Sequence, residues 1–124
     1  MPRVVHFEIP AQDSAKVVAF YKEVFGWEFN KWDQGDYWLV KTGEDSTPGI
    51  NGGLYAPGQG MSGTVNTIDV PDLDASVAKV KANGGQVVAP RMPVPGVGWL
   101  AYCKDVEGNV FGMMQADPNA SMPQ

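Results

Sequence analysis

The sequence contains the same pattern twice, and this repeat limits the folds open to the chain. Residues 5–10 lead into a helix-like stretch that ends at Gly26, and residues 67–72 lead into another that ends at Gly84 and Gly85. Each copy continues with short strand-like runs. A repeat of roughly sixty residues is too long for a solenoid unit. Two copies in 124 residues therefore predict an α+β domain built from two βαβββ modules.

The first module is predicted from hydrophobic periodicity. Residues 3–9 alternate as a strand, which places Val5, Phe7 and Ile9 on one face and Val4, His6 and Glu8 on the other. A helix capped by Asp13 or Ser14 follows and ends at Gly26. Its expected apolar stripe consists of Val17, Phe20, Tyr21 and Val24. Residues 27–29 and 37–40 are expected to form a hairpin that turns at residues 33–36, followed by a weaker strand over 50–55.

The second module follows the same order. A strand is predicted over residues 64–70 and a helix over 73–83, with Leu73, Val77 and Val80 facing inward. Strands are then predicted over 86–90, 98–104 and 109–115, and Gly108 suits the tight turn between the last two. The modules span about 3–56 and 63–116 in one domain of residues 1–116, and residues 117–124 are predicted to be a flexible tail. The glycines and prolines clustered at 46–63 and 90–98 predict long loops.

Composition limits the classes of partner that the chain is expected to bind and the cellular compartment in which it is expected. The net charge of −5 and the absence of a run of Lys or Arg argue against nucleic acid or a membrane surface as the partner. The apolar stretches are shorter than a membrane span, and the first residues lack the apolar run of a signal peptide. The one cysteine, Cys103, excludes a disulfide framework within the chain and fits the cytoplasm. Its place in a predicted strand favours an inert, buried thiol.

Three segments together resemble a known superfamily. The run from Phe20 to Trp27, FYKEVFGW, follows a strand that carries His6, and residues 105–112, DVEGNVFG, close the second module. Residues 72–85 are similar to the pattern of the superfamily's second helix. The chain thus resembles the vicinal oxygen chelate superfamily of glyoxalases, bleomycin-resistance proteins and extradiol dioxygenases over residues 3–116. The resemblance implies sheets that curl into a cup, and a homodimer, in some members formed by swapping modules.

The resemblance also implies positions for a metal site. Catalytic members hold one divalent metal through His and Glu side chains, and the metal leaves positions open for two substrate oxygens. His6 has the spacing of the first ligand, whereas the remaining positions fall on Val65, on Gly52 or Gly53, and on Gly112. One ligand of four remains, so no cofactor is expected. If a divalent metal binds, it binds at His6, and a rearranged site of His6, Glu8 and Asp69 is the alternative.

The cup interior supplies the candidate binding residues. Alternation places Val110, Gly112 and Met114 on the cup face, and Phe111 and Met113 against the helices. The aromatic residues on the strands are either core and dimer interface or the walls of a pocket for a flat, partly apolar molecule: Tyr37, Trp38, Trp99 and Tyr102. Which of Tyr37 and Trp38 faces inward depends on the register of their strand and stays open. Residues 92–98 are either a rim over the mouth or a plain surface loop. The expected ligand-binding residues are His6, Glu8, Trp38, Val65, Asp69, Trp99, Gly112 and Met114.

Two main functions remain open from the sequence. The first is a metal-free protein that binds a small, partly apolar molecule, with His6 and Glu8 as polar anchors. Sequestration of a toxic compound is one version of it. The alternative is an enzyme of the lyase or dioxygenase type. It would use a non-standard metal site, or His6 and Glu8 as catalytic acid and base next to a carbonyl. A structural role for the dimer is a third possibility.

Overall fold

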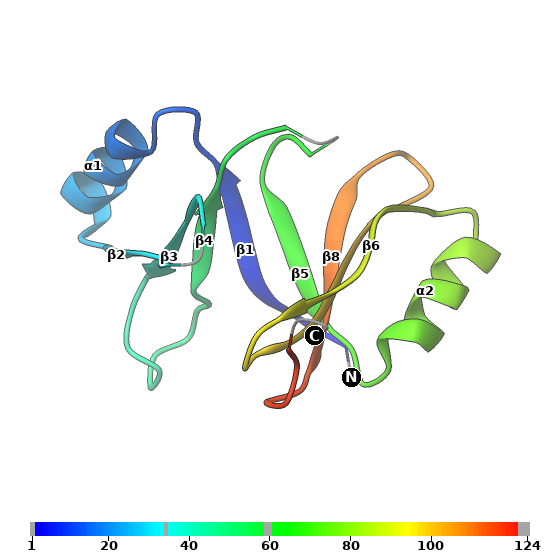
Figure 1. The fold of residues 1–124 in the computed structure, drawn as a ribbon. Helices are drawn as coiled ribbons and strands as arrows, with labels where there is room; N and C mark the ends of the chain where they lie inside the picture. The colour runs from blue at the N-terminus through cyan, green and yellow to red at the C-terminus, as the bar shows by residue number, and fades with distance from the viewer. Residues whose placement is uncertain (1, 34, 59–60, 122–124) are drawn as a thin grey trace. The chain divides into compact units, whose positions relative to one another are not determined.

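Each copy of the repeat folds as the order βαβββ, which confirms the predicted α+β class (Figure 1). The computed structural model describes residues 2–33, 35–58 and 61–121. Of these, residues 5–65 form one compact unit, called the first module here. Residues 66–121 and 2–4 form the other, called the second module. Residues 2–4 belong to the second because the backbone N–H of Asp69 donates to the carbonyl of Arg3 at 2.9 Å.

The first module is a four-stranded sheet with α1 packed on one face. Its elements are β1 (Val4–Pro10), α1 (Ser14–Phe25), β2 (Glu28–Lys31), β3 (Tyr37–Lys41) and β4 (Gly52–Tyr55). The strand order is β2-β3-β4-β1, with β1 and β4 parallel and the other neighbours antiparallel. Val17 and Val18 of α1 pack against a core of Ala11, Val40 and Leu54.

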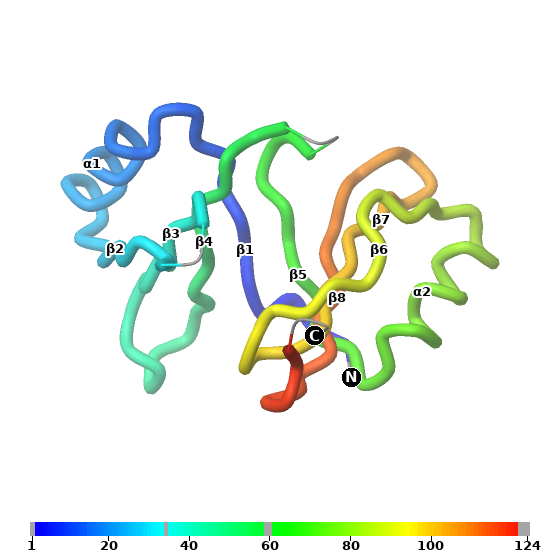
Figure 2. Tube along the Cα trace, in the orientation of Figure 1, coloured from blue at the N-terminus to red at the C-terminus, as the bar shows by residue number. Residues whose placement is uncertain are grey.

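The ends of α1 lie where the sequence predicts them, but the side chains that face the sheet are not all the predicted ones. The side chain of Asp13 accepts a hydrogen bond from the Lys16 N–H, and Gly26 ends the helix with φ 72°, from where the chain enters β2 (Figure 2). The stripe prediction is wrong for Phe20 and Val24, which are 57% and 54% exposed. Tyr21 stacks on Trp27 with ring centroids 5.0 Å apart. This contact turns the face containing Val17, Val18 and Tyr21 toward the sheet.

The second module repeats the arrangement with a larger sheet. Its elements are β5 (Val65–Asp69), α2 (Leu73–Ala82), β6 (Gln86–Val94), β7 (Gly98–Lys104) and β8 (Val110–Ala116). The strand order is β5-β8-β7-β6, and β5 and β8 are parallel. Leu73, Val77 and Val80 pack on the core as predicted, and Cys103 is buried within that core. Gly108 has φ 86° in the turn before β8, also as predicted.

The prediction of a loop or rim over residues 92–98 is wrong. β6 continues to Val94 and pairs with β7 throughout, with register shifts between Val87 and Ala89 and between Ala89 and Met92. β6 is the last strand in its order, and this edge position is where a sheet tolerates prolines such as Pro90 and Pro93. Only residues 95–97 form the turn before β7.

The predicted boundary after Ala116 is too early. The Asp117 N–H donates to the carbonyl of Val97, and the Gly96 N–H donates to the carbonyl of Ala120, each at 3.0 Å. Ala120 is buried. These contacts extend the second module to Ala120, and residues 122–124 of the predicted tail lie outside the described part.

Two other predictions touch undescribed residues. The hairpin between β2 and β3 closes with a hydrogen bond from the Trp32 N–H to the Tyr37 carbonyl, while Gln34 of its predicted turn lies outside the described residues. β4 lies within the weaker strand predicted over 50–55, and residues 59–60 of the predicted loop region 46–63 are not described. Among the described residues, neither helix has the length and hydropathy needed to cross a membrane.

Candidate functional site

The strand register divides the first module's sheet into an apolar face and a polar face. Gly53 pairs with Glu8 on β1 and with Leu39 on β3, and Tyr55 pairs with Tyr37. Paired residues share a face, and neighbours along a strand alternate. The face opposite α1 is called the polar face here and contains His6, Glu8, Tyr37, Gly53 and Tyr55. The sequence correctly placed His6 and Glu8 together on the face opposite Phe7 and Ile9.

Trp38 lies on the other face, and Tyr37 takes the place expected for it. Trp38 packs against the core of Val40 and Leu54 under α1, so the prediction that its ring lines the binding face is wrong. Residues 37–40 are apolar throughout, and alternation in the sequence therefore did not identify the inward side chain. The sequence left open which of Tyr37 and Trp38 faces inward, and the strand register selects Tyr37.

Tyr37 reaches across β4 to His6. Its hydroxyl oxygen lies 2.8 Å from Nε2 of His6, although the two residues are on strands separated by β4. The ring passes over Gly53, where an added Cβ would overlap the Tyr37 hydroxyl oxygen and Cζ. The missing side chain at Gly53 therefore makes the hydrogen bond between Tyr37 and His6 sterically possible.

Burial sets the protonation states on the polar face. Burial lowers the pKa of His6, and the negative charge of Glu8 opposes this in part. The imidazole is therefore neutral at neutral pH, with one ring nitrogen as donor and the other as acceptor. Burial and the charge of Glu8 both raise the pKa of Tyr55, whose hydroxyl donates to the Gly63 carbonyl at 2.6 Å. Glu8 is only 5% exposed, so the face combines a buried carboxyl group with a neutral imidazole and two phenols.

The second module presents a smaller candidate face opposite α2. Thr67 pairs with Gly112 and Asp69 with Met114, so all four share one face, while Met113 packs on the core below α2. This confirms the predicted alternation along β8. Thr67 is buried, and a Cβ on Gly112 would lie 3.0 Å from its hydroxyl oxygen and 3.2 Å from Cε1 of Tyr102. Val65 is fully buried on β5.

Trp99 does not belong to that face, contrary to prediction. Counting from Gly98, alternation puts Trp99 with Ala101 and Cys103 on the side of α2, and its ring packs on that core. Its Nε1 donates to Asp117 at 3.0 Å, and the guanidinium of Arg91 lies 4.3 Å from the ring centroid. Arg91 also pairs with Asp74 of α2 at 2.8 Å. Trp99 is therefore part of a packing cluster.

The side chains at the expected metal positions do not fit the superfamily's metal. Nε2 of His6 is hydrogen-bonded to Tyr37, Val65 is aliphatic, and Gly53 and Gly112 have no donor atoms. The register identifies Gly53, not Gly52, as the β4 position on the face of His6. In the described part of the chain, no three His, Cys, Asp or Glu side chains form a group that could hold a metal ion.

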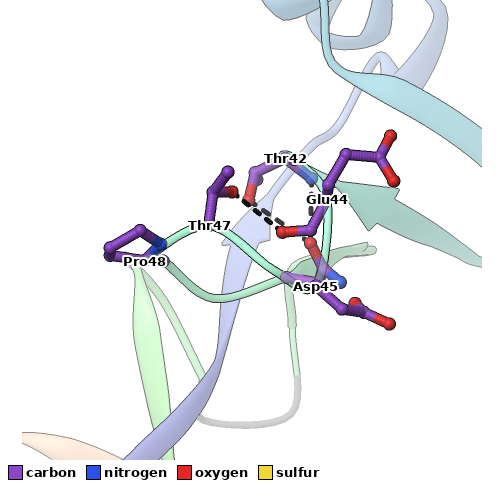
Figure 3. A pocket seen from close by; sticks show the side chains of 8 residues that line it. Thr42, Glu44, Asp45, Thr47 and Pro48 are labelled. Atoms are coloured by element: carbon purple, nitrogen blue, oxygen red, sulfur yellow. Dashed lines mark hydrogen bonds between the residues drawn. The ribbon is translucent and has the colours of Figure 1, made fainter.

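Two small hollows lie in the first module. One has a volume of about 140 Å³ and lies in the connection between β3 and β4, where Thr42, Glu44, Asp45 and Thr47 line it (Figure 3). Backbone and threonine hydrogen bonds hold this loop, and its two carboxylates point in different directions. The other, of about 130 Å³, includes Ser14, Trp38 and Tyr55. Both are smaller than the roughly 300 Å³ of an ordinary ligand pocket.

Comparison with known proteins gives a consistent result. Residues 3–43 match a family model described as bleomycin resistance protein-like N-terminal. A glyoxylase-like domain-containing protein of Didymella fabae is 30% identical over 116 residues, 86% of this chain and 88% of that protein. The candidate glyoxylase CFP32 of Mycobacterium bovis and Mycobacterium tuberculosis is 30% identical over 105 residues, 82% of this chain. The chain spans only 39% of the length of CFP32.

Solved structures share the fold at low identity. A hypothetical protein of Bacillus halodurans aligns with a TM-score of 0.67 and 14% identity over 98% of this chain and 99% of the other. Methylmalonyl-CoA epimerase of Mycobacterium tuberculosis aligns with a TM-score of 0.65 and 16% identity over 93% and 88%. The methylmalonyl-CoA epimerase of Streptomyces coelicolor aligns with a TM-score of 0.65 and 18% identity, over 97% of this chain and 98% of the other. These likenesses establish the fold alone.

Proposed function

Because this chain belongs to the glyoxalase and bleomycin-resistance group of the vicinal oxygen chelate superfamily, we propose that it binds a small, partly apolar molecule without a metal ion. The polar face of the first module supplies the anchors. The observation that carries the proposal is the hydrogen bond between the Tyr37 hydroxyl and Nε2 of His6 across Gly53. This bond engages the imidazole nitrogen within the chain and places the ring of Tyr37 on the polar face.

The ligand class follows from the side chains on that face. The rings of Tyr37 and Tyr55 offer apolar surface, and the oxygen atoms of Tyr37, Tyr55 and Glu8 can accept hydrogen bonds besides the contacts that they already make. This combination suits a flat molecule with one or two polar groups, such as an aromatic carbonyl compound. Asp69, Val65, Gly112 and Met114 remain proposed contacts. Trp38 and Trp99 are left out because their rings pack beneath the helices.

A set of small aromatic ketones and carboxamides tests this proposal. We expect saturable chemical-shift changes in the backbone NMR spectrum at residues of the polar face, unchanged by excess EDTA. Tyr37→Phe should weaken binding by up to about tenfold, since it removes one hydrogen bond of roughly 0.5–1.5 kcal/mol. Tyr21→Phe is the matched control, because its ring stacks on Trp27 outside the face. Binding that EDTA abolishes, or that neither His6→Ala nor Tyr37→Phe changes, would contradict the proposal.

A second candidate function is metal-free proton transfer. A buried Glu8 and a neutral His6 share the face with a phenol, and such groups can remove a proton next to a carbonyl and stabilise the resulting enolate. Enzyme-dependent exchange of α-protons for deuterium in the same ketones, lost in Glu8→Gln, would support it. If no ketone exchanges faster than in buffer, the binding function stands alone.

The remaining proposals concern the cellular context. We propose a homodimer as the assembly and the cytoplasm as the compartment, with neither nucleic acid nor a membrane as partner. The acidic sequence and the single, buried Cys103 support this assignment.

A further inference from the structure

The ring of Tyr37 occupies the position on β4 where the superfamily's carboxylate ligand is expected. Gly53 stands beside Glu8 in the ladder with β1 and lies on the face of His6. A Cβ at Gly53 would overlap the hydroxyl oxygen, Cζ and Cε1 of Tyr37, which leaves no volume for a longer side chain. At Gly52, a Cβ would instead meet Phe7, on the face of α1.

The same tyrosine contacts the one remaining ligand candidate. Its hydroxyl oxygen lies 2.8 Å from Nε2 of His6, within hydrogen-bond distance. A metal ion coordinated through Nε2 needs the lone pair of this nitrogen and the space in front of it. Tyr37 fills that space. A single side chain thus covers the His6 ligand atom and the volume of the missing carboxylate.

We propose that Tyr37 and Gly53 together exclude divalent metal ions from the first module, with the phenol taking the place of the carboxylate ligand. This inference rests on the metal-free site proposed above and identifies the residues responsible for it. Tyr37 then determines whether the polar face can bind a metal ion or only an organic ligand.

Substitutions at Tyr37 and Gly53 should reverse this exclusion of metal ions. With the ring removed and a glutamate at position 53, three donors would project from one face of two neighbouring strands: His6, Glu8 and the new carboxylate. Neighbouring strands are about 4.8 Å apart, and side chains two residues apart on a strand share a face, so the three lie within reach of one ion. One imidazole and two carboxylates suit a first-row divalent metal with open positions.

Cobalt titration of purified variants of the 124-residue chain tests the roles of Tyr37 and Gly53. Tyr37→Ala/Gly53→Glu should bind one equivalent of Co²⁺, seen by its visible absorption, about tenfold or more tightly than the natural protein or Tyr37→Ala. An outer-shell partner alone changes metal affinity roughly 10–100-fold, and a direct ligand should do at least as much. Adding His6→Ala to the double variant should abolish the gain. Gly53→Glu alone should not bind, because Tyr37 still fills the space. A folded double variant without tighter binding, or a gain that survives His6→Ala, would overturn the proposal.

A second measurement uses the conservative change Tyr37→Phe. It tests the role of Tyr37 even if the double variant does not fold. In the natural protein, the ring nitrogen resonances of His6 should not respond to excess Zn²⁺, whereas in Tyr37→Phe they should shift. An equal response in both proteins would refute the role of Tyr37. These readouts concern metal alone, so failure to find an organic ligand would count against the proposed function and not against this inference.

Discussion

The Tyr37 ring has room only because residue 53 has no side chain. The free energy of unfolding of Gly53 variants measures how much this fit contributes to stability. Gly53→Ala places a Cβ where the Tyr37 hydroxyl lies, so the ring must leave His6 or the strands must move apart. We expect the free energy of unfolding in urea to fall by about 1–3 kcal/mol, as for other overpacked sites.

The matched control is Gly35→Ala, where the new Cβ would make ordinary contact with Trp32 at 3.8 Å. Adding Tyr37→Ala to Gly53→Ala should recover part of the loss, because the obstructing ring is gone. A Gly53→Ala protein as stable as the Gly35→Ala protein would show that the ring does not lie over β4.

His6 should make stability depend on pH just below neutrality. Burial lowers its pKa below the ordinary value of 6.5, so the unfolded chain takes up the proton first as the pH falls. Stability is therefore complete above about 6.5 and is lost as the pH falls from there toward the lower pKa of the folded protein. We expect the unfolding midpoint to drop as the pH is lowered below about 6.5, and the drop to disappear in His6→Gln.

His6 is the only histidine in the chain, so few other side chains titrate in this window. The pKa values of Asp105 and Asp117 are lowered by hydrogen bonds, and the stability they add is lost only at more acidic pH, below their ordinary value of 3.8. The same slope in natural protein and His6→Gln would mean that the imidazole is not buried as described.

Sequence reasoning was most successful at this scale where polar and apolar residues alternate. His6 and Glu8 alternate with Val5, Phe7 and Ile9, so their shared face was predictable. The orientation of the Tyr37 side chain was not predictable, because residues 37–40 are all apolar. It follows from the register between β3 and β4, in which Tyr37 pairs with Tyr55 and Leu39 with Gly53. Trp99 was misplaced although the bounds of β7 were predicted correctly, because those bounds do not tell which face of the strand packs against α2.

At the scale of the element, the cap of α2 offers a matched test. The side chain of Asp72 accepts a hydrogen bond from the Ala75 N–H at 3.0 Å. Asp72→Ala leaves this donor without its cap, and we expect a loss of about 1 kcal/mol in the free energy of unfolding. Asp72→Asn keeps the acceptor and should cost much less. Equal losses for Ala and Asn would mean that charge near the helix dipole, and not the hydrogen bond, stabilises this end.

The elements themselves were largely predictable from local signals, since caps, glycine stops and apolar spacing are encoded within a few residues. The errors arose where tertiary position overrides them. Prolines in β6 are tolerated because that strand has a free edge, and the edge is a property of the sheet. The exposed Phe20 fits a helical stripe, but the stacking of Tyr21 on Trp27 selects a different face.

At the scale of the whole molecule, the repeat was sufficient for the fold but not for the ligand. Two copies of βαβββ follow from the pattern of the sequence, whereas the identity of a bound molecule depends on a few side chains that differ among proteins of one fold. The metal positions illustrate this point. Their loss was visible in the sequence as Val65 and Gly112, but the replacement of a carboxylate by Tyr37 required the strand register.

The assembly state is the last prediction. Phe20, Val24 and Phe25 form an apolar stripe on α1 and are 57%, 54% and 60% exposed. A two-fold axis that packs this stripe against its copy would bury these three side chains on both chains. We expect light scattering to give about 27 kDa, twice the chain mass of 13.3 kDa. Phe20→Ser/Phe25→Ser should give the monomer mass.

The matched control is Val106→Ser, which removes another exposed apolar side chain, 71% exposed, from the turn before β8 and should leave the dimer intact. This contrast separates a specific interface from general apolar association, since only the first depends on which exposed residue is changed. A natural protein of 13.3 kDa, or a dimer that survives both serines in α1, would show that this stripe does not form the interface between copies.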